Sequence, residues 1–331
     1  TFINIKRDLS KVTGANVSIR FTDEFMKAVV KKENFTLRWP VDARPRDAKI
    51  TKDICASEIW DQFVDSAWSA AEPGALFWDT VTKNTPADIY SDLGFASEST
   101  NPCGELVLCP YDSCRLMVIN LASFVEDPFS DCPKFQFDRL HEVAVKAQRL
   151  MDDLVDLELE AVDKILNKIK NDKQPENVKQ VEFDLWTKIR DKCEKGRRTG
   201  LGVTALGDAL AMMNLTYGSA RSVKWTGKIY KALAVGAHTS SCILAEERGS
   251  FPIFDHDLES NHSYLRRIMK ACGPDVEEMW RTTGRRNIAL TTTAPVGSGS
   301  TMTQTTSGVE SAFLLKYKRR RKLVPGDNRK P

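Results

Sequence analysis

The stretch Ser99-Thr-Asn-Pro-Cys-Gly-Glu105 comes shortly before an apolar run, Leu116-Met-Val-Ile-Asn-Leu121. The apolar run predicts a buried strand, because a strand covered on both faces is apolar at consecutive positions. The stretch before it places an amide, a thiol and a carboxylate at alternate positions: Asn101, Cys103 and Glu105. In an extended chain, side chains at alternate positions point to one side, roughly 6 to 7 Å apart. The pattern therefore predicts a reaction centre presented at the end of a rigid strand.

An ordinary turn is the alternative interpretation of the same residues. Asn-Pro and Cys-Gly pairs are frequent in turns, and a lone cysteine is usually a small packing residue. Pro102 would stiffen the entry to such a turn, and Gly104 would permit close approach of another backbone. Spacing alone does not decide between a turn and a reaction centre.

Strand and helix patterns alternate along the rest of the chain, which predicts the α/β class. A half-buried strand is expected at 17–21, and Thr22 then caps a helix that buries Phe25, Met26, Val29 and Val30. The other expected elements are helices over 59–71, 140–155, 202–213 and 224–247, a solvated helix and loop over 163–192, an irregular segment over 82–100 and a strand at 288–290.

Composition bounds the class of protein. The chain has 331 residues, 41% hydrophobic and 28% charged, and no apolar run approaches the roughly 18 to 20 residues of a membrane span. A net charge of +3 is too small to predict nucleic-acid binding, although Lys316–Lys322 is a local basic cluster. We expect a cytoplasmic protein without membrane or nucleic-acid partners. Thr1 and Pro331 both look like truncated ends.

The eight cysteines are too few for a secreted disulfide scaffold, so those that matter are expected to be catalytic, redox-active or metal-bound. Five of them fall in ordinary contexts and are interpreted as packing residues: Cys55, Cys132, Cys193, Cys242 and Cys272. The four histidines show no metal-ligand spacing, and no metal site is expected. Gly200-Leu-Gly-Val-Thr-Ala205 fits a loose dinucleotide-binding pattern, but the charged residues before it cannot form the buried strand that this pattern requires.

Two segments carry a resemblance to a known family. Asn101–Glu105 together with Cys114–Phe124 resembles the radical-bearing finger loop of ribonucleotide reductases, most closely the adenosylcobalamin-dependent class II type. Arg286–Ser300 and Thr305–Glu310 resemble the substrate-phosphate loop of that family. Weaker similarity extends from near Thr1 to the basic cluster. The resemblance implies a ten-stranded α/β barrel over 1–331 with the finger loop inside it, the finger loop and following strand at 98–125, and the phosphate loop region at 286–313.

The same resemblance implies roles for individual residues. Cys103 would carry a thiyl radical that removes the 3′ hydrogen of a ribose, Glu105 would act as general base, and Asn101 would hold the sugar hydroxyls. Cys114 would be one member of a redox-active pair. Its partner would lie upstream of the chain, and a Cys109–Cys114 bridge is a further alternative. Because a radical must be kept from water, the thiol is expected inside the barrel.

The phosphate-binding residues implied by the resemblance form one run, in which small side chains let backbone N–H groups converge on an anion. A helix is expected to begin near Ser298. Val296 and Ser311 depart from the family's usual residues, which affects details of phosphate geometry. The run consists of Pro295, Val296, Gly297, Ser298, Gly299 and Ser300.

The function implied is the reduction of ribonucleoside diphosphates to deoxyribonucleotides with adenosylcobalamin as cofactor. A thioredoxin-like reductant acting through a C-terminal tail beyond the chain, a complementing reductase fragment and a homodimer are the expected partners. One alternative is the same chemistry with the radical supplied by a separate metal subunit. The others are a non-catalytic nucleotide-binding half of a split reductase and a zinc-binding structural protein.

Overall fold

The computed structural model describes residues 2–8, 12, 14–41, 43–312, 314, 316 and 318, and most of them are helical. The α-helices are α1 Asp23–Lys31, α2 Ala56–Ala70, α3 Trp78–Asn84, α4 Phe137–Asn171, α5 Glu176–Gly196, α6 Leu206–Met212, α7 Ala220–Arg248, α8 His256–Ser260, α9 Ser263–Cys272, α10 Pro274–Thr282 and α11 Gly297–Thr303. The short 3-10 helices are η1 Phe2–Arg7, η2 Pro45–Asp47, η3 Pro86–Leu93 and η4 Leu121–Phe124.

The described strands pair two by two. Two pairs are parallel, β1 Ser18–Phe21 with β4 Gly74–Phe77 and β7 Met117–Asn120 with β10 Leu201–Thr204. Three pairs are antiparallel, β2 Asn34–Trp39 with β3 Ile50–Cys55, β5 Ser99–Thr100 with β6 Val107–Leu108, and β8 Val125–Glu126 with β9 Lys134–Phe135. The mixed α/β class is thus confirmed. Among these strands no closed barrel forms, and the ten-stranded barrel stays a prediction.

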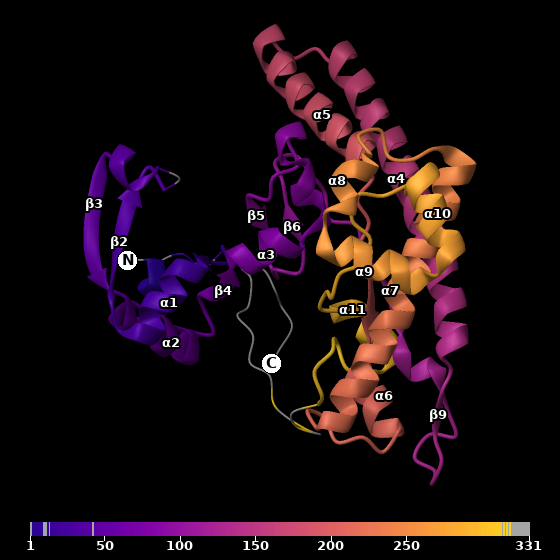
Figure 1. The fold of residues 1–331 in the computed structure, drawn as a ribbon. Helices are drawn as coiled ribbons and strands as arrows, with labels where there is room; N and C mark the ends of the chain where they lie inside the picture. The colour runs from indigo at the N-terminus through magenta and orange to yellow at the C-terminus, as the bar shows by residue number, and fades with distance from the viewer. Residues whose placement is uncertain are drawn as a thin grey trace.

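The elements fall into three groups along the chain, as Figure 1 shows. The strands β1 to β4 with α1 and α2 form one group around an aromatic cluster that includes Phe21, Phe25 and Phe63. Helices α4 to α10 form the largest group, in which α4 and α7 pack along each other. The hairpin β5–β6 and helix α3 lie between these groups. The stretch that carries Asn101, Cys103 and Glu105 therefore lies where the two larger groups meet.

The strand β10 is the centre of the largest core. All four of its residues are buried, and β7 pairs with it along one edge. The segment before the predicted phosphate loop runs along the other edge, where Leu201 N donates to Leu290 O (2.8 Å) and Thr292 N donates to Leu201 O (3.0 Å). The predicted strand at 288–290 is therefore an extended segment, with a bridge only at Thr291. Apolar residues of α4 and α7 cover this core, as expected for parallel strands buried on both faces.

Of the pattern Gly200-Leu-Gly202, the last two residues lie in β10 and Gly200 immediately precedes it. A Cβ on Gly202 would lie 2.6 Å from Thr292 O, and one on Gly200 would lie 2.6 Å from Arg115 O. Both glycines thus allow neighbouring backbones to approach closely. The helix predicted over 202–213 is wrong at its start, because helix α6 begins only at Leu206.

Several other expectations can be compared with the structure. The side chain of Thr22 caps α1 by accepting from Phe25 N, and α7 spans the predicted 224–247 segment. Val30 was expected to be buried, but it is 81% exposed because α1 buries only the side that carries Phe25 and Ala28. The irregular segment expected over 82–100 is also wrong, since much of it forms η3, with Tyr90 buried.

A fully buried ion pair anchors the segment that leads to residues 286–300. Glu259 and Arg285 are both 0% exposed, and Arg285 Nη2 donates to Glu259 Oε1 at 2.6 Å. Tyr90 Oη (2.9 Å) and Trp280 Nε1 (2.8 Å) also donate to the Glu259 carboxylate. Arg285 donates as well to the carbonyl oxygens of the two residues Asn287 and Ile288. The pair thus joins η3, α8 and α10 to the start of the extended segment.

Asn287 extends this anchoring to the long helices. Its side-chain Oδ1 accepts from Gln148 Nε2 on α4 (3.1 Å) and from Ser241 Oγ on α7 (2.9 Å). Its Nδ2 donates to Asp152 Oδ1 (2.9 Å) and to Arg197 O (3.0 Å). Every polar atom of this buried amide is therefore paired, as a stable interior requires.

No helix among the described residues is both long and apolar enough to cross a membrane. The basic cluster at 316–322 lies largely outside the described residues.

Candidate active site

Asn101–Leu106 forms the tip of the β5–β6 hairpin. Asn101 N donates to Leu106 O (3.2 Å), and Gly104 N donates to Asn101 O (3.0 Å), which closes a turn of four residues. Gly104 adopts φ +80°, a conformation that favours glycine. The extended arrangement predicted for Asn101, Cys103 and Glu105 is therefore wrong, because the chain reverses direction between the first residue and the last.

Two asparagine side chains fix this turn. Asn101 Oδ1 accepts from Leu106 N (3.0 Å), so the oxygen of the amide is used within the loop. Asn16 Nδ2 donates to Pro102 O (2.7 Å) and ties the tip to the amino-terminal group of strands. The amide nitrogen of Asn101 remains the part of that side chain that could donate to a ligand.

Cys103 is exposed at the tip of the turn. A Cβ added to the neighbouring Gly104 would meet no heavy atom within 4 Å, so open space lies beside the thiol. The expectation that this thiol is held away from water is wrong for the described residues, because no described element covers the outer side of the hairpin tip.

Glu105 faces the opposite way, into the protein. Its Oε2 is buried and accepts no hydrogen bond from the described residues. It borders a cavity of about 400 Å³ that is also lined by Arg198, Tyr264, Arg267 and Arg285. The backbone carbonyl oxygen of Glu105 accepts from Thr292 Oγ1 at 2.6 Å. The carboxylate is thus oriented toward a cavity with several cationic walls, while its backbone is bound to the segment before the predicted phosphate loop.

Cys114 lies between two anchored residues, close to the hairpin tip. Asp112 Oδ2 accepts from the buried Arg198 Nε at 2.6 Å, and Arg115 Nη1 donates to Arg198 O at 2.9 Å. The Cys114 side chain is exposed. Partial burial still raises the pKa of its thiol, and the nearby charges of Glu105 and Cys103 raise this pKa further.

The other cysteines range from buried to exposed, with Cys55 and Cys272 half-buried, and all eight are free thiols. Cys109 is buried, and this burial together with Asp112 raises its pKa to about 11. The alternative Cys109–Cys114 bridge is not formed. Cys193 and Cys242 are buried as predicted, whereas the packing role expected for Cys132 is wrong because its side chain is exposed. Among the described residues, no group of three or more His, Cys, Asp or Glu side chains is arranged to hold a metal ion.

Helix α11 begins at Gly297, one residue before the predicted start. Gly297 and Ser298 at its first turn are exposed, as is Pro295, whereas Val296 and Ser300 are buried. Ser300 Oγ donates to Gly297 O at 2.8 Å, so this hydroxyl is used within the helix.

The segment after the helix is tied to the core. Thr306 donates to Asp208 Oδ2 from both its amide nitrogen and its hydroxyl, each at 2.7 Å, and Thr306 O accepts from Thr204 Oγ1 at 2.8 Å. The segment after α11 is thus fixed to the core, and the first N–H groups of α11 have no acceptor within the helix, as at every helix start.

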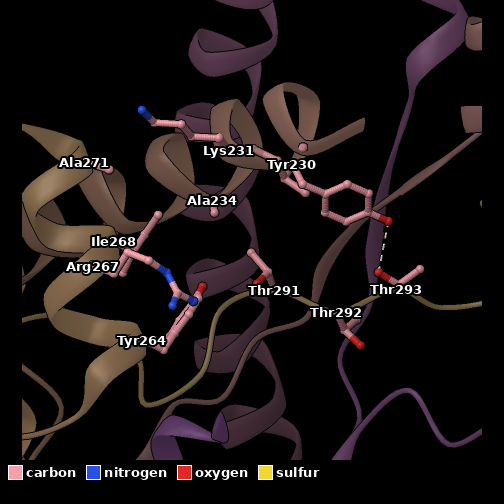
Figure 2. A pocket seen from close by; sticks show the side chains of 12 residues that line it. Tyr230, Lys231, Ala234, Tyr264, Arg267, Ile268, Ala271, Thr291, Thr292 and Thr293 are labelled. Carbon is pink, nitrogen blue, oxygen red and sulfur yellow. Dashed lines mark hydrogen bonds between the residues drawn. The ribbon is translucent and has the colours of Figure 1, made fainter. Parts of the chain in front are cut away.

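A larger pocket lies between α7, α9 and the extended segment, as Figure 2 shows. Its volume is about 620 Å³. Tyr230 Oη lies 3.1 Å from Thr293 Oγ1 on one side. Tyr264, Arg267 and Thr291 line both this pocket and the cavity beside Glu105. The two cavities therefore adjoin, and the pocket does not include Cys103.

His238 borders the cavity beside Glu105, and we expect it to make the stability of the chain depend on pH. Its ring is 2% exposed and shares a hydrogen bond of 2.8 Å between Nδ1 and Ala234 O. Burial and the nearby Arg285 lower the pKa of His238 to about 3. The unfolded chain gains a proton at this residue near pH 6.5 and the folded chain does not, so stability is lost as the pH falls from about 6.5 to about 3.

We expect this loss to be smaller in His238→Gln, which has no charge to gain. Between pH 7 and pH 5, the free energy of unfolding should fall by about 2 kcal/mol more in the wild type than in the variant. Urea unfolding at the two pH values, at constant ionic strength, measures both differences. Equal losses in the two proteins would contradict the assignment.

Sequence reasoning did not identify the residues that connect the site. Thr292, Asn16 and Asp208 all make hydrogen bonds to the two candidate loops across 86 to 187 residues of sequence. Thr292 stands in a run of three threonines, and nothing in that run distinguishes the buried one. The alternation of side chains along an extended segment offered one weak indication that Thr292 differs, because the middle of three consecutive residues points away from the side of its two neighbours.

Comparisons with known proteins agree with the resemblance of the two loops. Residues 1–327 match the family model described as ribonucleotide reductase, barrel domain. The chain is 31% identical over 310 residues to a vitamin B12-dependent ribonucleoside-diphosphate reductase of Mycobacterium tuberculosis, covering 94% of this chain and 36% of the relative. It is 32% identical over 321 residues to a protein of the same name from Thermoplasma acidophilum, covering 96% of this chain and 34% of the relative.

A more distant similarity reaches another type of reductase. The chain is 24% identical over 281 residues to the ribonucleoside-diphosphate reductase large subunit of Variola virus, covering 83% of this chain and 33% of the relative. The chain spans about a third of the length of these relatives. Taken with the match over 1–327, these similarities show that the chain belongs to the ribonucleotide reductase barrel-domain family.

Proposed function

We propose that this chain is the catalytic barrel portion of an adenosylcobalamin-dependent ribonucleoside-diphosphate reductase. One observation carries the proposal: the hairpin that carries Cys103 and Glu105 is hydrogen-bonded, through the carbonyl oxygen of Glu105 and the hydroxyl of Thr292, to the segment that leads to α11. The names of the relatives at 31% and 32% identity support the cofactor and the diphosphate substrate. The thiol, the base and the anion-binding turn would then lie on one frame.

Each side chain would contribute one step. Cys103, as a thiyl radical, would take the 3′ hydrogen atom of the ribose, while Glu105 takes the proton of the 3′ hydroxyl. The 2′ hydroxyl would leave as water. Cys114 and a second cysteine would supply two electrons and two protons and end as a disulfide, with one proton used to form the water and one to form the new C2′–H bond. Cys103 would then return the hydrogen atom to the 3′ carbon, and Glu105 would return the proton to the 3′ oxygen. The amide nitrogen of Asn101 would hold a sugar hydroxyl, because its oxygen is bound to Leu106 N.

We infer that the radical donor would approach Cys103 from its exposed side. A Cβ on the neighbouring Gly104 would meet no heavy atom within 4 Å, which supports this direction of approach. Adenosylcobalamin, when bound, would supply the unpaired electron. Cys103 is the residue that would face it.

A radical supplied by a separate metal subunit is the second candidate, and the similarity to the viral large subunit favours it. An assay of a reconstituted reductase distinguishes the two candidates. By reconstituted reductase we mean the chain supplemented with the regions of its relatives that it does not span. Turnover that requires added adenosylcobalamin supports the first candidate. Turnover that requires a second, metal-containing protein instead would contradict it.

The proposed function is tested by conversion of cytidine diphosphate to its 2′-deoxy form. We expect the reconstituted reductase to turn over and the isolated 331-residue chain to remain inactive with dithiol reductants. Multiple turnovers by the isolated chain would contradict the assignment of its redox partner to another segment. A chain that binds the diphosphate but never turns over would support a non-catalytic nucleotide-binding module.

A further inference from the structure

One peptide group of the finger loop is held from both of its ends. The carbonyl oxygen of Glu105 accepts from Thr292 Oγ1 at 2.6 Å, and the next N–H, that of Leu106, donates to Asn101 Oδ1 at 3.0 Å. A peptide group is planar, so fixing its oxygen and its hydrogen fixes its plane and, with it, the position of the Glu105 Cα, which lies in that plane. The side chain that extends from this Cα carries the carboxylate.

Thr292 itself is set in place by β10. Its amide donates to Leu201 O at 3.0 Å, and its side chain is 9% exposed. A Cβ on Gly200 would lie 3.1 Å from Thr292 Cγ2, and one on Gly202 would lie 2.6 Å from Thr292 O. The two glycines therefore leave space in which the threonine lies close to β10 with its methyl group packed and its hydroxyl directed to the hairpin.

The two neighbouring threonines have different surroundings. Thr293 is exposed and its hydroxyl lies 3.1 Å from Tyr230 Oη, while Thr291 borders both cavities together with Tyr264. All three threonines border the larger pocket, as Figure 2 shows. Only the middle hydroxyl of the three bonds to the finger loop.

We propose that Thr292 is a positioning residue for Glu105, which aims the carboxylate of the general base from the same segment that carries the phosphate-binding turn. This inference rests on the proposed function. Pro295 follows Thr292 by only three residues, so the position of the base and the position of the substrate phosphate are set by one stretch of backbone. A small displacement of a reacting group lowers turnover strongly, by about 100-fold for a shift on the order of 1 Å.

The first test measures amide hydrogen exchange in the 331-residue chain by mass spectrometry. In Thr292→Val, which keeps the shape and removes the hydroxyl, the peptide covering 101–106 should exchange about 3- to 10-fold faster, as expected for one lost hydrogen bond. Thr292→Ser should restore slow exchange, because it retains the hydroxyl, even if the lost methyl group lowers stability. Thr293→Val is the matched control and should leave exchange in this peptide unchanged.

The second test measures turnover of cytidine diphosphate in the reconstituted reductase. Thr292→Val should lower kcat by about 10- to 100-fold with KM changed by less than about 3-fold, and Thr292→Ser should recover most of the loss. Faster exchange with unchanged kcat would overturn the positioning role, as would slow exchange in Thr292→Val. If neither the wild type nor any variant turns over cytidine diphosphate, the proposed function fails. The exchange data then still decide whether Thr292 holds the loop.

Discussion

Cys103→Ser is expected to reduce turnover of a ribonucleoside diphosphate in the reconstituted reductase by about 10⁴-fold or more, the scale of loss when a reacting group is removed. The reason is the strength of the bond to hydrogen. A sulfur–hydrogen bond is comparable in strength to an activated carbon–hydrogen bond, so a thiol exchanges hydrogen with the sugar in both directions. A hydroxyl does not. Formation of the deoxynucleotide, followed by chromatography, measures the loss.

Cys132→Ser is the matched control, since it makes the same change at another exposed cysteine. Its turnover should remain within about 2-fold of the wild type, as expected for a surface substitution. Binding of cytidine diphosphate to the Cys103→Ser chain should persist, because the substitution leaves the proposed phosphate-binding turn intact. Turnover above a tenth of the wild-type rate in Cys103→Ser would show that another residue carries the radical.

Local signals in the sequence predicted those parts of the fold that local physics determines. Thr22 caps α1 because its hydroxyl can reach an amide three residues on, and this depends on nothing distant. The apolar run 116–121 predicted a buried strand, and β7 with Ile119 buried is found within it. The assignment of Asn101, Cys103 and Glu105 as a reaction centre depended on the family resemblance and stays a prediction.

Contacts between distant segments determine the features of the fold that local sequence patterns predicted wrongly. Alternation predicts one face only if the chain stays extended, but the hydrogen bonds of Asn101 and the positive φ of Gly104 close a turn instead. The segment over 82–100 is rich in Ser, Thr and Asp, yet Tyr90 is buried because it packs in an apolar cluster with Phe251, and its hydroxyl donates to Glu259, which lies 169 residues away. No pattern within either segment reports such a partner.

The exposure of Cys103 has a related explanation. Sequence reasoning placed the thiol inside a closed barrel, whereas the chain spans about a third of its relatives and its described strands pair two by two. The inner side of the hairpin is covered, since Glu105 Oε2 is buried, and the outer side is open. A sheltered thiol would therefore need elements beyond the described residues.

Glu259→Gln is expected to lower the free energy of unfolding by about 3 to 5 kcal/mol, because removing one partner of a buried ion pair leaves the other charge uncompensated. Arg285 is 0% exposed and donates from both Nε and Nη2 to the Glu259 carboxylate. The pKa of Arg285 is raised because the charge and hydrogen bonds of Glu259 outweigh its burial, so this guanidinium stays charged. Glutamine fills the same volume but supplies one acceptor oxygen and no charge.

Glu247→Gln provides the matched control, since it removes the same charge from an ion pair with Arg149 that is 38% and 44% exposed. Water screens such a pair, and the expected loss is below about 1 kcal/mol. Urea unfolding followed by circular dichroism measures both variants, and equal losses would show that the buried pair does not stabilise the fold. Arg285 also holds the carbonyl groups of Asn287 and Ile288. Because this segment continues to Thr292, the finger-loop peptide 101–106 should exchange faster in Glu259→Gln and remain unchanged in Glu247→Gln.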